Sequence, residues 1–177
     1  MQKLITLLFA LFFTLTAQAV SVQDDAGRTY DGRVPQRVVS LLPSLTESVC
    51  ALGACKRLVG VDRYSNYPLS VKALPQLGGL DDVNVEAIVA LKPDVVLAAP
   101  SSRVAERLSA LGIQVFTLDA KSYTDVRRVL LKLGELLDLP HAKKFWDQLE
   151  KHVAAAAQSM PARATGVTVY YLSLIHI

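Results

Sequence analysis

Polar, aromatic and cationic side chains follow four short apolar runs of this 177-residue chain. They offer hydroxyl groups, an amide, tyrosine rings and cations, which suit the noncovalent recognition of a small molecule. No activated nucleophile or general base accompanies them, so catalysis finds no support there. These groups are Ser44 and Thr46, the segment 63–68, Ser101 with Arg103, and the segment 121–123.

The segment 63–68 carries the clearest indication of a binding site. It contains Tyr64, Ser65, Asn66 and Tyr67, and it opens a stretch without regular periodicity that continues to residue 82. Long irregular segments in compact domains are usually functional or disordered. Two tyrosines so close together, in a chain with only 7% aromatic residues, predict an apolar wall with polar edges.

The elements that must position these groups alternate between strand and helix. Nearly continuous apolar runs at residues 37–42, 57–61, 94–98 and 113–118 predict strands that are buried on both faces. Strands separated by helices pair in parallel, so residues 20–139 are predicted to form an α/β lobe with a Rossmann-like parallel sheet. Because ligands bind beyond the carboxyl ends of such strands, all four groups are expected at one edge of the sheet.

Polar residues mark the expected helix starts. Ser44, with Glu47 three residues later, fits a capping box that opens a helix ending near Gly53. Asn84 is expected to cap a second, short helix. For Ser44 and Ser102, each taken alone, helix capping is favoured over ligand binding.

Beyond the lobe, the chain is predicted to form one long helix and the start of a second lobe. Residues 140–160 would form a helix about 30 Å long, with an ion pair between Asp147 and Lys151. Residues 166–172 are expected to be the first strand of a truncated C-terminal lobe. Residues 173–177 resemble translated adapter sequence and are expected not to be native.

Residues 1–19 fit a secretory signal peptide. Lys3 supplies the positive charge, an apolar run extends from residue 4 to residue 15, and residues 17–19 form an A-x-A cleavage site. The run is shorter than the roughly 20 apolar residues of a membrane span. The mature chain is therefore expected to begin at Val20, to be exported and not to insert into the membrane.

Composition and motifs exclude several classes of function. The net charge is only +3, with 19 Lys and Arg against 16 Asp and Glu, and no basic block suggests nucleic-acid binding. Dinucleotide, phosphate-loop and serine-hydrolase motifs do not occur. His141 and His152 are not at metal-ligand spacing and are expected on the exposed side of the long helix, so no protein metal site is predicted.

The two cysteines, Cys50 and Cys55, leave two alternatives open. An exported protein can form a disulfide. However, one cysteine within a helix and one just past its end need not bring their Cα atoms close enough for the bond. This spacing favours two buried, unbonded thiols.

Residues 37–160 resemble the first half of the periplasmic substrate-binding proteins with a helical backbone, which serve ABC importers of cobalamin, ferric siderophores and haem. The resemblance rests on VVSLLPSLTE at 38–47, LVGVD at 58–62, YSNYP at 64–68, NVEAI at 84–88 and LKPDVV at 91–96. It implies two α/β lobes joined by one long helix, with the ligand between them. It also implies a periplasmic, monomeric receptor without catalytic activity or a permanently bound cofactor. An exported α/β enzyme with its catalytic residues in the missing half is the weaker alternative.

The resemblance further implies roles for individual residues. Cobalamin binders look most similar, and Tyr64 would face the corrin ring. Leu80 stands where those proteins can place a tryptophan, which leaves a ferric siderophore or haem open as ligand; the metal would arrive inside the chelate. Glu86 matches a glutamate that docks into arginines of the permease, although an acid in a first helical turn is also favoured by the helix dipole. The expected ligand-binding residues are Ser44, Thr46, Tyr64, Ser65, Asn66, Tyr67, Leu80, Ser101 and Arg103.

Overall fold

A computed structural model of the chain describes residues 19–79 and 81–159. Its centre is a four-stranded sheet in the order β4-β3-β5-β6, and every neighbouring pair of strands runs parallel. This architecture confirms the predicted α/β fold class. The strands are β3 (Val38–Ser40), β4 (Leu58–Val61), β5 (Val95–Ala98) and β6 (Val115–Thr117).

The strand order changes direction at β3. The chain passes from β3 to β4 on one side, and then returns to place β5 on the other side of β3. Val38 accordingly pairs with Leu58 in β4 and with Val95 in β5. In an open parallel sheet such a switch point leaves a crevice at the carboxyl ends of the two diverging strands.

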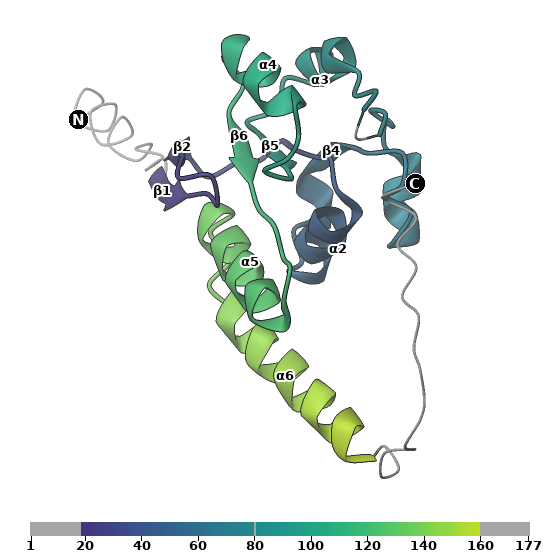
Figure 1. Cartoon of the computed structure of the whole chain (residues 1–177), viewed down its shortest axis with the longest axis vertical. Helices are drawn as coiled ribbons and strands as arrows, with labels where there is room; N and C mark the ends of the chain where they lie inside the picture. The colour runs from purple at the N-terminus through teal and green to yellow at the C-terminus, as the bar shows by residue number, and fades with distance from the viewer. Residues whose placement is uncertain (1–18, 80, 160–177) are drawn as a thin grey trace, which may run out of the picture.

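Helices cover both faces of the sheet and make three layers (Figure 1). One face packs against α2 and α5, and the other packs against α3 and α4. The four helices are α2 (Pro43–Ala51), α3 (Val85–Leu91), α4 (Val104–Ala110) and α5 (Tyr123–Leu136). Two short 3-10 turns, η1 (Cys55–Arg57) and η2 (Leu69–Ala73), flank β4 and the irregular segment after it.

Successive strand residues divide the core between these two layers. Val38 and Leu97 pack toward α2 and α5, whereas Val39 and Val96 pack toward α3 and α4. All four side chains are fully buried. Side chains alternate across a strand, so a sheet covered on both faces favours apolar residues at nearly every position. The three-layer packing therefore explains the nearly continuous apolar runs in the sequence.

A two-stranded antiparallel sheet precedes the lobe and was not predicted. β1 (Ala19–Gln23) pairs with β2 (Thr29–Arg33), with Ala19 opposite Arg33. Its strands bury Val22 and Tyr30 in the apolar core, and half-buried Val20 packs against it. Such short, largely polar strands give a weak sequence signal. Ala19 is the last residue of the predicted signal peptide; residues 1–18 lie outside the described residues, so the cleavage site stays a prediction.

The predicted capping box at the start of α2 is wrong. The N-cap is Leu42, no side chain caps the helix, and Pro43 occupies its first turn. Proline suits this position because its missing N–H would have no partner in a first turn and its φ is already helical. Ser44 therefore lies inside the helix, and its side chain is exposed.

The helices on the other face include one confirmed cap and one correction. Asn84 caps α3 as predicted, and its Oδ1 accepts a hydrogen bond of 2.9 Å from the amide of Ala87. At α4, Arg103 rather than Ser102 is the N-cap residue, and no side chain caps the helix.

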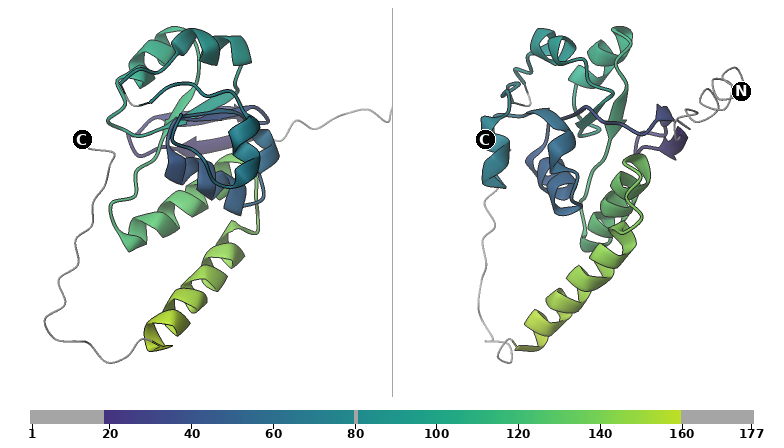
Figure 2. Two further views of the ribbon diagram at one scale, coloured as in Figure 1. Left: turned by 90° about the vertical axis from the view of Figure 1, so that its right-hand side faces the viewer. Right: turned by 180° about the vertical axis from the view of Figure 1, so that it is seen from behind.

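The predicted long helix is α6 (Ala142–Ser159), which begins two residues later than Pro140. It continues away from the α/β lobe in all views (Figures 1 and 2). Trp146 is buried and packs against Tyr123 of α5, with ring centroids 5.2 Å apart. Asp147 pairs with Lys143 at 2.8 Å instead of the predicted Lys151.

The outer part of α6 is not buried by any other described part of the chain. Residues 151–159, including His152, are all exposed. His141, just before the helix, is also exposed, but its Nε2 lies 2.9 Å from the carbonyl oxygen of Leu52 and so ties α6 to the turn after α2. Met160 and the predicted segments 166–172 and 173–177 lie outside the described residues.

Cys50 and Cys55 form a disulfide, contrary to the favoured expectation of free thiols. Cys50 is in the last turn of α2, and Cys55 begins η1. The chain reverses between them through Gly53, whose φ of +80° suits glycine. This tight turn brings the two Cα atoms to 4.0 Å, which the linear spacing alone did not reveal.

Candidate ligand-binding site

A pocket of about 690 Å³ lies beyond the carboxyl ends of β3, β5 and β6, between α2 and α5. Its position coincides with the switch point of the sheet, where ligands of open α/β sheets bind. The lining combines apolar side chains with a few polar ones, as small-molecule sites usually do. The apolar members include Leu42, Leu45, Leu118, Val126 and Val129, and the polar members include Ser44, Ser48, Ser101 and Lys121.

Ser44 and Ser101 are brought together by the fold as predicted. Both line this pocket and both are exposed, one from the first turn of α2 and the other from the loop after β5. Lys121 adds an ammonium group. Among the described residues its only ion pair is with Asp119, at 3.5 Å. The Lys121 side chain is 84% exposed, so water screens that pair and the ammonium group can reorient toward a ligand.

The tyrosine-bearing loop follows β4 at the same edge of the sheet. Tyr64 is 60% exposed, Tyr67 is 65% exposed, and Asn66 between them is also exposed. Leu69 continues this apolar surface at the start of η2. Exposed apolar side chains that gather on one loop are candidates for an interaction or ligand site.

Thr46 and Ser65 were predicted to contact ligand, but both are buried beneath this surface. The Thr46 hydroxyl donates to Ser40 Oγ at 2.8 Å and lies 2.9 Å from Ser65 Oγ. Ser65 donates to Asp62 Oδ2 at 2.5 Å, and Asp62 Oδ1 accepts from the amide of Tyr64 at 2.8 Å. These two residues hold the tyrosine loop on the ends of β3 and α2. The prediction that they contact ligand is therefore wrong, and they support the loop from below instead.

Three other predicted residues have different placements. Arg103 is exposed at the start of α4 and does not line the pocket. Leu80 lies outside the described residues. Glu86 is exposed in the first turn of α3, on the opposite face of the sheet from α2 and α5, so it is accessible to another protein.

Asp24 joins the N-terminal hairpin to β6 and was missed by sequence reasoning. Its buried carboxylate accepts hydrogen bonds from the Thr117 hydroxyl at 2.7 Å, the Thr117 amide at 3.0 Å and the Arg28 side chain. Burial alone would raise the pKa of Asp24, but these hydrogen bonds outweigh it and lower the pKa below its ordinary value of 3.8.

Asp25 makes a second link, from the hairpin to α5. Its carboxylate pairs with Arg128 and, at 3.1 Å, with Lys132. Burial alone would raise the pKa of Asp25, but the bonds from the Arg128 side chain, the Asp119 amide and Lys132 together lower it. The local spacing of Asp24 and Arg28 allows an ion pair, but the partners that join the hairpin to the lobe, Thr117 for Asp24 and Arg128 and Lys132 for Asp25, lie 93 or more residues further along the chain.

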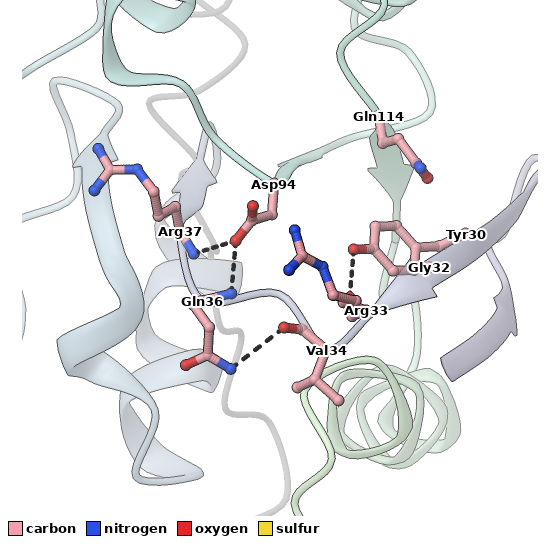
Figure 3. A pocket seen from close by; sticks show the side chains of 8 residues that line it. All are labelled: Tyr30, Gly32, Arg33, Val34, Gln36, Arg37, Asp94 and Gln114. Carbon is pink, nitrogen blue, oxygen red and sulfur yellow. Dashed lines mark hydrogen bonds between the residues drawn. The ribbon is translucent and has the colours of Figure 1, made fainter. Parts of the chain in front are cut away.

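A second pocket, of about 490 Å³, lies at the opposite edge of the sheet (Figure 3). Asp94, just before β5, uses Oδ2 to accept from the amides of Gln36 and Arg37 at 2.8 Å each. Arg33 and Gln114 also line this space. It contains none of the predicted ligand residues and lies at the amino ends of the strands, so the carboxyl-edge pocket is the candidate site.

Two further features bear on function. Within residues 19–79 and 81–159, no group of three or more His, Cys, Asp and Glu residues is placed to hold a metal ion. In the same part of the chain, no helix combines the length and the apolar character that crossing a membrane requires.

Known proteins resemble this chain in sequence and in structure. The family described as periplasmic binding protein matches residues 38–174. The vitamin B12-binding protein of Yersinia pestis (strain Pestoides F) is 36% identical over 143 residues, which cover 76% of this chain and 51% of that protein.

Solved structures give the same picture. A periplasmic haem-binding protein from Pseudomonas aeruginosa has a TM-score of 0.61 and 34% identity, over 72% of this chain and 50% of that one. The periplasmic vitamin B12-binding protein of Vibrio cholerae has a TM-score of 0.60 and 26% identity, over 72% and 53%. The chain thus spans about half the length of the curated relatives it matches.

Proposed function

Because this chain belongs to the periplasmic binding protein family, we propose that it supplies one lobe of a receptor that delivers a metal chelate to an ABC importer. Cobalamin is the first candidate ligand, and haem or a ferric siderophore is the alternative. The observation that carries the proposal is the pocket at the switch point of the sheet, which shares its edge with the exposed rings of Tyr64 and Tyr67. The receptor acts in the periplasm as a monomer when its second lobe is present.

Support for a chelate ligand comes from the chemistry of this edge and from the relatives. Exposed tyrosine rings offer flat apolar surfaces to a macrocycle, while Ser44, Ser101 and Lys121 can bind its polar side groups. The Yersinia pestis and Vibrio cholerae relatives are named for vitamin B12, and the Pseudomonas aeruginosa relative is named for haem. No resident metal is needed, because the metal belongs to the cargo.

The direct test is a titration of the chain followed through its amide resonances. Cyanocobalamin, haemin and a ferric hydroxamate siderophore are added separately. Resonances of Ser44, Tyr64, Tyr67 and Ser101 are expected to shift with at least one of them, whereas Gln114 at the amino-edge pocket stays unchanged. Tyr64→Ala should weaken the response, and Leu111→Ala, at an exposed position next to α4, serves as the control. Shifts with none of the three compounds would reject the proposal.

Glu86 is proposed as the contact to the permease. An exposed carboxylate can bind an arginine of a partner through two parallel hydrogen bonds. Glu86→Ala in the two-lobed receptor should lower ligand uptake by cells that carry the importer, while the affinity for ligand stays the same. Glu135→Ala, exposed on α5 at the opposite face of the sheet, is the matched control. Uptake equal to that of the unmodified receptor would show that Glu86 does not dock.

A further inference from the structure

The exposed ring of Tyr64 lies close to the backbone of Gly79, in a turn that brings Gly78 and Gly79 near Asp82. A methyl group added to Gly79 would lie 3.2 Å from Cε2 of Tyr64 and 3.6 Å from its hydroxyl oxygen. Gly79 is buried, although the Tyr64 side chain above it remains 60% exposed. The turn therefore supports one side of the ring and leaves much of its surface available.

Asp82 fastens this turn to the loop that carries Tyr64. Its Oδ1 accepts a hydrogen bond of 2.7 Å from the amide of Gly79, and its other oxygen pairs with the guanidinium of Arg63. The amide of Arg63 in turn donates to the carbonyl of Gly78 at 2.8 Å. The residue directly before Tyr64 is thus held to the turn at two points, one through its backbone and one through its side chain.

Gly78 closes the turn in a way that only glycine permits. Its φ is +95°, and a methyl group there would lie 2.3 Å from the carbonyl oxygen of Asp82. At Gly79 no such backbone restriction is present, and the obstacle to a side chain is the ring of Tyr64 together with the Asp82 carboxylate, 3.2 Å from the added methyl. Substitution of Gly79 therefore perturbs the ring more directly than the backbone.

We propose that Gly79 and Asp82 are positioning residues that fix the orientation in which the Tyr64 ring meets a flat, conjugated macrocycle. This inference rests on the proposed function, since it assigns to Tyr64 the contact with the chelate. A ring that is oriented before binding loses less side-chain freedom when the ligand arrives, and this raises affinity. The amide of Gly79 and the guanidinium of Arg63 also lower the pKa of Asp82 below its ordinary value.

The first test follows the Tyr64 ring without any ligand. The chain is labelled with 3-fluorotyrosine, and the resonance of residue 64 is assigned by its loss in Tyr64→Phe. Gly79→Ala and Asp82→Ala should each shift or broaden this resonance. Asp82→Asn should have a smaller effect, because its amide oxygen can still accept from Gly79. Leu111→Ala, at an exposed position after α4, is the control and should leave this resonance unchanged.

The second test asks whether Gly79 acts through the ring. In titrations with cyanocobalamin and with haemin, Gly79→Ala should weaken binding by up to about tenfold, the size of one aromatic stacking contact. In a Tyr64→Ala background the same substitution should change binding less than about twofold. The resonance of fluorinated Tyr30, a buried residue of the hairpin, reports in every variant that the lobe is folded.

The two tests separate this inference from the proposed function. An unchanged Tyr64 resonance in both Gly79→Ala and Asp82→Ala would overturn the positioning role, whatever the chain binds. A loss of affinity that persists in the Tyr64→Ala background would overturn it as well, because Gly79 would then act without the ring. If neither probe binds while the fluorine spectra change as expected, the positioning role stands and the proposed choice of ligand fails.

Discussion

The Thr46 hydroxyl shows how a residue can serve the site without facing it. It lies at the centre of a buried chain of polar groups that runs from Ser40 in β3 to Asp62 after β4. Each of these groups is buried away from water, so its hydrogen bonds must come from protein partners. These polar groups anchor the tyrosine loop. Removal of the Thr46 hydroxyl should therefore lower the stability of the folded lobe.

Replacement of Thr46 by valine tests that dependence. Valine has nearly the same shape but cannot bond to Ser40 or Ser65, so Thr46→Val is expected to lower the free energy of unfolding by about 1–3 kcal/mol. Urea denaturation followed by circular dichroism measures the change. Thr29→Val, at an exposed position of β2, should change stability little. Equal values for the two variants would contradict the supporting role of Thr46.

The sequence predicts which edge of the sheet carries the site. It does not show which of the polar residues there are exposed to a ligand and which are buried beneath the surface. Ser44 and Ser101 line the pocket and Tyr64 is exposed, whereas Thr46 and Ser65 are equally polar and face inward. Burial of a hydroxyl depends on which partners the folded chain brings to it, and Ser65 meets Thr46 only after β3 and β4 have paired. Spacing along the chain does not contain that information.

Among the elements, the N-terminal hairpin is joined to the rest of the lobe by charged side chains. It is joined to β6 through Asp24 and to α5 through Asp25, both of which carry lowered pKa values. A carboxyl group whose pKa is lowered on folding stabilises the folded state fully above its ordinary pKa. That stabilisation is lost as the pH falls from 3.8 through the folded-state value.

Asp24→Asn is therefore expected to destabilise the lobe at neutral pH more than in acid. The loss at pH 7 should be about 2 kcal/mol, because the charge-assisted bonds to Thr117 and Arg28 are weakened. Below pH 3.8 the unmodified protein loses the same contribution, and the two unfolding curves should approach each other. Urea unfolding at pH 7 and at pH 3 gives the comparison, with exposed Asp31→Asn as control. A gap of constant size at both pH values would refute this linkage.

The sheet was more predictable than the hairpin and the helix starts. Strands β3 to β6 are apolar at nearly every position, with Ser40 and Thr117 as polar exceptions at strand ends, and this signal comes from a sheet covered on both faces. In β2, Asp31 and Gly32 interrupt the pattern, and the strand is held by its partner and by side-chain bonds from Asp24. At α2 the serine of an apparent capping box was outcompeted by Pro43, which begins the helix itself.

At the scale of the whole molecule, α6 projects beyond the lobe that it follows (Figure 2). Its first turns are fixed by buried Trp146, and the contact of His141 with Leu52 lies directly before them. The relatives that share this fold are about twice as long as the matched region. We expect the apolar residues that α6 exposes, such as Val153, to be contacted by the second lobe in the two-lobed receptor.

The chain of 177 residues is consequently expected to bind cyanocobalamin weakly. Ligand pockets typically cover roughly 70–90% of a ligand surface, and a single lobe can cover only one side. Isothermal titration calorimetry should give a dissociation constant weaker than micromolar for this chain and a tighter one for the two-lobed protein. Micromolar or tighter binding by the single lobe would contradict a site shared between two lobes.

The covalent link between Cys50 and Cys55 makes the lobe sensitive to the compartment in which it matures. Thiols stay reduced in the cytosol and become oxidised outside it, so a molecule kept in a reducing compartment would lack the link. Closing so small a loop is worth about 2 kcal/mol in the chain-entropy description. Protein prepared from a reducing cytoplasm should therefore contain free thiols at Cys50 and Cys55 and be less stable than the disulfide-bonded form. The production host thus decides which of the two forms is obtained.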